Sequence, residues 1–403
     1  MSDRPVFAVL WSLAGRLSVK AVAFGFSVFL ARLLTPADFG LVGMVSVFLS
    51  VATLFFDCGF PLAIIRKTDR VERDFSTVFV FQFAASLVSA AAMCAASPLV
   101  AGFFREPELT PIVCAMSLNL LLSAIASVPA VKLRIRLDFR TLSVVQTLTA
   151  LVSGGIGLFL AARGMGPWAI VWQGLVSGVV NATLLCAAAG WLPRFEFAPD
   201  TFREFFAFGW RQLTVSFAQT VYQQSNAFLI GRRFSSADVG LYNRAEYYTS
   251  EPSTLVTQGI GDVCYPDLCR LRPDPVAFRR RYRAVSAVQA VVSLTGFGVL
   301  VMFTAEIIEW LIGPQWLGCV PMIRVLAVGY AVEPIRRLLL TPCYVDGRMD
   351  VVLRLEVAEI AVAFGFLFVS LPFGVLALCW ARTAYQLFSL ALNLFVCRRY
   401  LRR

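Results

Sequence analysis

Five basic residues lie inside otherwise apolar stretches of the chain: Arg16, Lys20, Arg211, Arg324 and Arg382. A charged side chain is costly in hydrocarbon, so each is expected to face the interior of a helical bundle or a water-filled cavity. Arg16, Lys20 and Arg211 are therefore predicted to line a hydrophilic cavity.

A polar stripe accompanies these charges on the apolar stretch 205–230. At 3.6 residues per turn, five polar side chains fall on one face, and Arg211 and Tyr222 flank them. These five are Gln212, Ser216, Gln219, Gln223 and Asn226. Such residues can hydrogen-bond neighbouring helices, but five on one face favour a hydrophilic cavity. The predicted substrate-binding set is thus Arg16, Lys20, Arg211, Tyr222 and these five residues.

Several acidic residues have sequence positions that indicate structural roles. Glu333 and Arg337 stand at i,i+4 and predict an ion pair, and Glu356 and Glu359 are expected to start a helix, where acids are favourable. Arg324 and Arg382 could pair with these acids instead of facing substrate.

Catalytic signatures are not visible in the sequence. It has no P-loop, no G-x-S-x-G and no histidine, and its ten cysteines are scattered without a CxxC motif. We therefore predict a protein that is not an enzyme and has no metal site or cofactor.

Composition places the chain in a membrane. It is 58% hydrophobic and only 15% charged, and its mean hydropathy is +0.73, whereas soluble domains are nearer 25% charged. A helical span needs about 20 mostly apolar residues, and twelve spans are predicted, the first one retained rather than cleaved. Their approximate ranges are 7–31, 39–61, 77–101, 110–130, 142–162, 168–189, 205–230, 239–262, 284–305, 316–341, 351–372 and 374–397.

An internal repeat divides these spans into two sets. FLARLLTPADFGL at 29–41 recurs as FLIGRRFSSADVGL at 228–241, and each copy contains a capping pattern that ends one helix and starts another. A weaker echo pairs Gly166, Ala169 and Trp172 with Gly374, Ala377 and Trp380. The prediction is an all-α polytopic protein with two parallel six-helix lobes, residues 1–200 and 201–403, around a central cavity.

Basic residues predict the orientation. With the N-terminus in the cytoplasm, cytoplasmic segments hold 25 Lys and Arg and outer turns hold 6. This asymmetry indicates that both termini are cytoplasmic. The net charge of +11 belongs mostly to these loops and does not indicate nucleic acid.

Three stretches resemble one family. Arg32–Gly40, Gly164–Gln173 and Trp191–Phe195 are similar to the first half of bacterial polysaccharide-biosynthesis flippases, members of the multidrug/oligosaccharidyl-lipid/polysaccharide (MOP) exporter superfamily. The resemblance implies two six-helix lobes whose cavity alternates between the faces of the bacterial inner membrane. Many members carry two further C-terminal helices, whereas twelve spans are expected here.

The resemblance also implies a substrate: undecaprenyl-diphosphate-linked oligosaccharides for exopolysaccharide, capsule or O-antigen (lipopolysaccharide) synthesis. A polysaccharide polymerase and export machinery are the implied partners, beside the lipid bilayer. Arg16, Lys20 and Arg211 would then receive the diphosphate, and the amides of 212–226 the sugars. Two rivals remain, a multidrug antiporter of the same superfamily and a membrane glycosyltransferase or polymerase.

Overall fold

The structure, a computed structural model, describes residues 4–67, 69–345 and 348–401. Within these ranges every regular element is a helix. The first eight are α1 (Arg4–Leu33), α2 (Pro36–Asp57), α3 (Phe60–Arg66), α4 (Glu72–Phe104), α5 (Leu109–Ile135), α6 (Phe139–Ala162), α7 (Pro167–Ala189) and α8 (Pro199–Arg233). The next are α9 (Ser236–Arg270), α10 (Pro275–Met302), α11 (Thr304–Ile312), η1 (Pro314–Cys319), α12 (Val320–Leu339), α13 (Thr341–Val345), α14 (Met349–Ser370), η2 (Leu371–Phe373) and α15 (Val375–Leu401).

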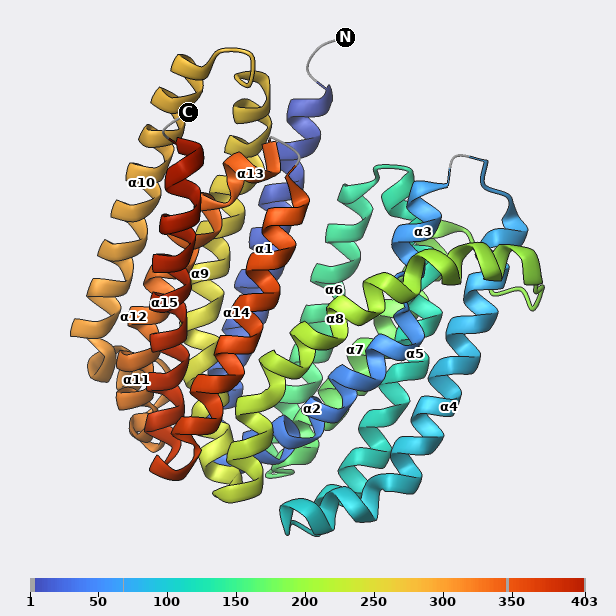
Figure 1. The fold of residues 1–403 in the computed structure, drawn as a ribbon. Helices are drawn as coiled ribbons and strands as arrows, with labels where there is room; N and C mark the ends of the chain where they lie inside the picture. Colours follow the sequence, from blue (N-terminus) through green and yellow to red (C-terminus); the bar gives the residue numbers. More distant parts are fainter. Residues whose placement is uncertain (1–3, 68, 346–347, 402–403) are drawn as a thin grey trace. The chain divides into compact units, whose positions relative to one another are not determined.

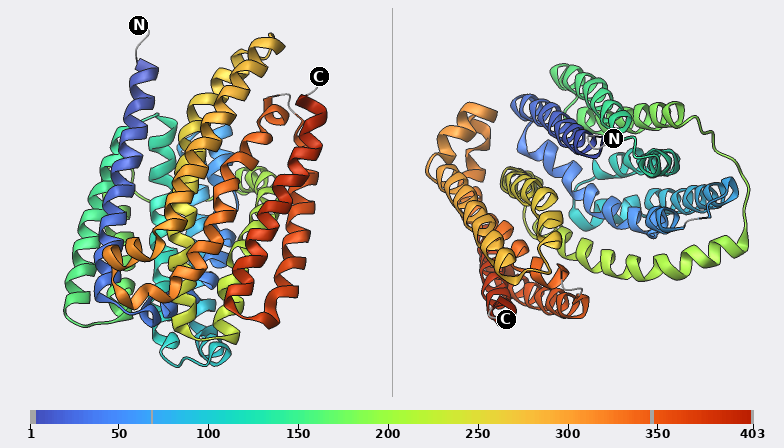
Figure 2. Two further views of the ribbon diagram at one scale, coloured as in Figure 1. Left: turned by 90° about the vertical axis from the view of Figure 1, so that its left-hand side faces the viewer. Right: turned by 90° about the horizontal axis from the view of Figure 1, so that it is seen from above.

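The chain divides into two compact units, Met1–Val239 and Gly240–Arg403. In the first unit α4 and α5 run antiparallel side by side, as do α6 and α7, while α1 lies along α6 (Figures 1 and 2). In the second unit α12 packs against both α10 and α15, and α14 packs against α15. The lobe boundary expected at residue 200 stays a prediction. In the structure α8, which follows that residue, packs on α2, α3 and α4 within the first unit.

Length and hydropathy make the chain a polytopic membrane protein. Nine stretches of the described residues are long and apolar enough to cross a bilayer. The helices α1, α8 and α9 are not among these stretches. Both α8 and α9 contain 35 residues, so they extend well beyond the predicted ranges 205–230 and 239–262. These two long, polar helices are where a hydrophilic path through an apolar bundle can be sought.

Both copies of the repeated motif form the predicted capping turn. Thr35 Oγ1 accepts from Asp38 N at 3.3 Å, and Ser235 Oγ accepts from Asp238 N at 3.2 Å. The two aspartates each accept in return from the backbone N–H of the capping residue, at 2.8 and 3.1 Å. Such reciprocal bonds satisfy two of the amide groups that a helix start leaves open, so they fix where α2 and α9 begin.

The weaker echo also shares a backbone geometry. Gly166, directly before α7, has φ of 55°, and Gly374, directly before α15, has φ of 96°. Both angles lie in the region that favours glycine. The two glycines that the weaker repeat pairs thus both have positive φ, and each directly precedes the last helix of its predicted half.

Candidate substrate-binding site

The first predicted residues lie on α1. Arg16 and Lys20 stand one helical turn apart, and the helix packs on α6. Lys20 is half-buried, while the side chain of Arg16 lies outside the described residues. That Lys20 lines a cavity therefore stays a prediction.

The polar stripe of α8 is not uniform. Gln219 and Gln223, one turn apart, are exposed, Ser216 and Tyr222 are half-buried, and Asn226 is buried with 3% of its surface accessible. The side chains of Arg211 and Gln212 are outside the part that the structure describes. The exposed amides fit the cavity interpretation, and the burial of Asn226 fits helix–helix contact.

A further amide of α8 was missed by the sequence prediction. Gln224 Nε2 donates to Ser50 Oγ of α2 at 3.2 Å. Gln224 lies about 100° around the helix from Gln223, outside the stripe. The sequence pattern around Gln224 does not indicate that its side chain faces α2. One face of α8 therefore packs on α2 through Gln224, while Gln219 and Gln223 are exposed.

A charged cluster holds the beginning of α8. Lys67 Nζ lies 3.2 Å from Asp74 Oδ1 and 3.3 Å from Glu204 Oε2. Thr201 Oγ1 donates to the same Asp74 oxygen at 3.2 Å. Burial of the Lys67 ammonium lowers its pKa, but the hydrogen bonds and charges of Asp74 and Glu204 outweigh burial, so the net shift of the Lys67 pKa is upward. The first turns of α8 are thus tied to the start of α4.

Aromatic packing reinforces this attachment. The Phe60 ring of α3 lies 6.0 Å from the Phe202 ring and 6.4 Å from the Phe205 ring of α8. Farther along α8, a Cβ placed on Gly209 would come within 2.0 Å of the Cys58 carbonyl oxygen. Only glycine permits this approach of α8 to the end of α2. These contacts set the direction in which α8 carries its polar stripe.

The second unit contains a buried polar network of its own. Arg382 of α15 pairs with Glu246 of α9 at 2.7 Å and donates to the Tyr330 hydroxyl of α12 at 2.7 Å. Tyr330 in turn donates to Glu246 at 3.2 Å, and a weaker bond joins Arg382 to the Tyr242 hydroxyl at 3.3 Å. The sequence raised pairing with an acid as an alternative for Arg382; the observed partner is Glu246, not one of the acids named there. Arg324, in contrast, is exposed on α12.

A second network confirms one expectation and corrects another. Glu333 pairs with Arg337 at 2.8 Å, as the i,i+4 spacing predicted, and also with Arg336 at 2.8 Å. Arg336 reaches Glu359 of α14 at 2.8 Å. The expectation that Glu359 starts a helix is wrong, because α14 begins at Met349 and Glu359 is buried within it. Its burial is compensated by Arg336 and by the Asn393 amide at 2.7 Å.

The predicted set lies on two helices of the first unit. Arg16 and Lys20 share α1, the other seven residues share α8, and both helices belong to the first unit. They pack on different neighbours, α6 for α1 and α2 to α4 for α8. A common lining built from Arg16, Lys20 and Arg211 therefore remains a prediction. Among the described residues, no group of three or more His, Cys, Asp or Glu side chains could hold a metal ion.

The arrangement of these helices is similar to that of solved polytopic membrane proteins. The structure resembles the inward closed conformation of the lipid II flippase MurJ with a TM-score of 0.80, 11% identity and coverage of 97% of this chain and 87% of that one. It resembles the inward-facing conformation of a multidrug resistance MATE family transporter of the MOP superfamily with a TM-score of 0.73 and 13% identity, covering 95% and 94% of the two chains. At these identities the likeness shows the fold alone.

The sequence comparison identifies the family of the chain. Residues 29–321 match the family described as "Polysaccharide biosynthesis protein", and the chain belongs to that family. It is 25% identical over 287 residues to the teichuronic acid biosynthesis protein TuaB of Bacillus subtilis (strain 168), covering 69% of this chain and 58% of that protein. It is 24% identical over 336 residues to the succinoglycan biosynthesis transport protein ExoT of Rhizobium meliloti (strain 1021), covering 83% and 66%. The chain thus spans less than two thirds of the length of these relatives.

Proposed function

We propose that this protein is a transporter, not an enzyme, that moves polyprenyl-diphosphate-linked oligosaccharide units across the bacterial cytoplasmic membrane. Its membership in the polysaccharide biosynthesis family carries the proposal. One relative is named as a transport protein of succinoglycan biosynthesis, and a protein of the same fold is named as a lipid II flippase. The product would serve exopolysaccharide, capsule or O-antigen synthesis, with a polymerase and export machinery receiving it.

The chemistry assigned to the site follows from the substrate. A diphosphate crossing a low-dielectric region unpaired would cost several kcal/mol after relaxation, by analogy with buried ions. Arg16, Lys20 and Arg211 would supply the compensating charges, and the exposed amides of Gln219 and Gln223 would hydrogen-bond sugars. Alternation of the two six-helix lobes, residues 1–200 and 201–403, would carry the head group across while the polyprenyl tail stays in lipid.

Three acids with arginine partners argue against the multidrug antiporter. An exporter of cations needs a carboxylate that can exchange a drug or a proton. Here Glu246 is paired with Arg382, Glu333 with Arg336 and Arg337, and Glu359 with Arg336. Each of these carboxylates already has a guanidinium partner at hydrogen-bond distance, which leaves it less open to a drug cation. This arrangement favours a site that binds an anion over one that binds a cation.

Charge removal tests the proposal in a deletion strain that accumulates carrier-linked glycan in the inner leaflet. Arg16→Ala, Lys20→Ala and Arg211→Ala should each reach the membrane at native abundance but lower glycan export at least tenfold, because one phosphate partner is lost. Arg16→Lys and Arg211→Lys should retain part of the export, since the charge remains. Arg163→Ala, at the far end of α6, is the matched control and should export normally.

Two results would contradict the proposal. If the deletion strain accumulates no carrier-linked glycan, the substrate class is wrong. If it does accumulate glycan but all three alanine variants restore export fully, transport stands and the cationic lining is wrong.

A further inference from the structure

The connection between α9 and α10 carries an excess of positive charge. Residues 264–285 contain six arginines and two aspartates, and no lysine or glutamate. Both aspartates are engaged within the hairpin. Asp267 pairs with Arg281 at 2.7 Å, and Asp274 caps α10 by accepting from the backbone N–H groups of residues 276 and 277 at 3.0 Å each. The other five arginines are therefore not neutralised by acids of this segment.

The arginines of α10 stand at the edge of the part of the helix that can cross hydrocarbon. Residues 284–302, the remainder of α10, contain no charged side chain. This stretch is about 28 Å long at ~1.5 Å per residue, which matches the roughly 30 Å hydrocarbon core of a bilayer. Arg283 thus stands where the hydrocarbon ends, and Arg280 lies about 5 Å farther out. Lipid headgroups occupy this layer.

Arg280 and Arg283 lie on the side of α10 that faces away from its packing partners. The opposite side packs on α12, where Tyr282 is buried and its hydroxyl donates to the Leu338 carbonyl at 3.4 Å. Arg280 and Arg283 are both exposed. Within the part of the chain that the structure describes, neither takes part in a hydrogen bond or an ion pair. Both guanidinium groups are therefore open to a ligand.

An exposed apolar stripe continues from these two arginines along the same face of α10. Ala287, Val291 and Leu294 follow Arg283 at intervals of three or four residues, so they share one helix face with it. All three are exposed, Val291 at 64% and Leu294 at 53% of their surface. The face thus presents charge at headgroup depth and apolar side chains beneath it, in the order in which a phospholipid presents its phosphate and acyl chain.

We propose that this face of α10 binds one anionic phospholipid, with its phosphate at Arg280 and Arg283 and the upper part of an acyl chain along Ala287 and Val291. Basic clusters directly beside a membrane span bind anionic lipids. The surplus of arginine selects an anionic headgroup, because no acid on the hairpin competes for Arg280 or Arg283. The apolar stripe favours a lipid over an acidic protein, which would leave Val291 uncovered. The inference is independent of the transport activity.

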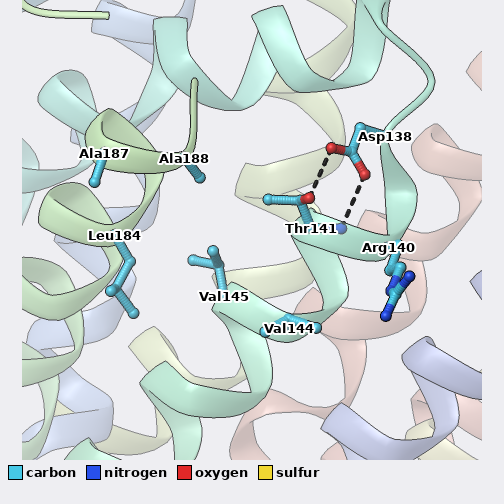
Figure 3. A pocket seen from close by; sticks show the side chains of 8 residues that line it. All are labelled: Asp138, Arg140, Thr141, Val144, Val145, Leu184, Ala187 and Ala188. Atoms are coloured by element: carbon cyan, nitrogen blue, oxygen red, sulfur yellow. Dashed lines mark hydrogen bonds between the residues drawn. The ribbon is translucent and has the colours of Figure 1, made fainter. Parts of the chain in front are cut away.

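The cavity between α6 and α7 supplies a matched control residue. Figure 3 shows Arg140 on the same wall of this cavity as Asp138 and Thr141. One arginine is accompanied there by one aspartate, whose carboxylate accepts from Thr141 N at 3.1 Å. The charges balance, so this cavity does not select an anion. Arg140 is exposed, and the predicted orientation puts it on the same side of the membrane as Arg280.

Native mass spectrometry of the detergent-purified full chain tests the proposal, with phosphatidylglycerol and phosphatidylcholine titrated separately. Wild type should retain one phosphatidylglycerol in preference to phosphatidylcholine. Arg280→Gln and Arg283→Gln should each weaken that retention about fivefold, which corresponds to the ~1 kcal/mol that one basic residue contributes at an anionic membrane surface. Arg280→Lys should retain most of the preference, since the charge remains. Arg140→Gln removes the same charge elsewhere and should leave retention unchanged.

Equal retention of the two lipids by wild type overturns the proposal. So does unchanged retention in both Arg280→Gln and Arg283→Gln, or an equal loss in Arg140→Gln, which would show that only overall charge matters. A poly-glutamate peptide that displaces phosphatidylglycerol from wild type at equal concentration would identify an acidic protein as the occupant, and this too would overturn the proposal.

Discussion

At the scale of single residues, the charge pairs of the second unit differ mainly in how far they are shielded from water. The Arg382 side chain is 10% exposed and its partner Glu246 is 23% exposed, whereas Arg337, paired with Glu333, is 62% exposed. A shielded pair is hard to break because the remaining charge loses both its partner and its water. An exposed pair contributes little, since water replaces the partner.

This difference predicts the effect of alanine substitutions. Arg382→Ala should lower the free energy of unfolding by up to about 3 kcal/mol, because Glu246 is left without its guanidinium among α9, α12 and α15. The double variant Arg382→Met/Glu246→Leu should recover much of that loss. Thermal unfolding of the detergent-purified protein measures both.

The control for this prediction is Arg337→Ala, which should cost at most about 1 kcal/mol. Equal losses for Arg337→Ala and Arg382→Ala would show that burial of the pair is not what stabilises it. No recovery in the double variant would show that Arg382 acts through packing alone.

The sequence could predict only the pairs that lie within one helix. Glu333 and Arg337 are four residues apart, and their contact follows from helical spacing. Arg336 and Glu359, or Arg382 and Glu246, meet only because α12 packs near α14 and α15 near α9. Helix packing is set by the shapes of many side chains, so a single sequence gives no spacing rule for these pairs.

At the scale of helices, small residues set how closely α6 is approached. A Cβ on Gly154 would lie 2.4 Å from the Phe26 ring of α1, whereas a Cβ on Gly155 would meet nothing within 4 Å. Of these two adjacent glycines, Gly154 is therefore the one that permits close packing of α1 on α6. Periodicity alone does not say which of two adjacent glycines faces the neighbour.

Alanine substitutions at this pair should therefore have opposite effects. Gly154→Ala should destabilise the protein by about 1–3 kcal/mol, because the Phe26 ring must move and α1 must shift on α6. Gly155→Ala should be neutral or stabilise by up to about 1 kcal/mol, since alanine is the better helix former and the space is open. Melting temperatures of the purified variants, compared with wild type, decide this. Equal melting temperatures for the two variants would contradict the assigned packing.

Helix boundaries were predictable where capping chemistry fixes them. The turns at Thr35–Asp38 and Ser235–Asp238 start α2 and α9 within a few residues of the predicted spans. The start of α8 was predicted too late, because Pro199–Glu204 is polar and reads as a loop. In the structure these residues are helical, and Thr201 and Glu204 bind the Asp74–Lys67 pair. Tertiary contacts thus extend the helix where hydropathy ends it.

At the scale of the whole molecule, the all-α polytopic fold was predictable because composition and span length constrain it strongly. The division into units was harder to predict. The predicted repeat would divide the chain at residue 200, whereas α8 is packed within the first unit through Lys67, Phe60 and Gln224. Sequence similarity between two halves and helix packing depend on different residues, so the two boundaries need not coincide.

The orientation in the membrane rests on charge and has a direct test. The connection between α9 and α10 is short, and Arg281 of α10 pairs with Asp267 of α9 at 2.7 Å. Arg270, Arg272, Arg279, Arg280 and Arg283 surround this hairpin. Such a dense positive segment resists transfer across the membrane, so we expect it to be cytoplasmic. Cys269, at the end of α9, is exposed and reports its location.

A variant that retains Cys269 and no other cysteine should resist an impermeant maleimide in intact cells and react fully after the membrane is permeabilised. Arg163→Cys in a cysteine-free background is the matched control, because Arg163 follows α6 and is predicted to lie on the outer face. It should react in intact cells. Labelling of Cys269 from outside, together with protection of residue 163, would invert the orientation. The diphosphate would then have to be received from the opposite leaflet, which is inconsistent with export of units made in the cytoplasm.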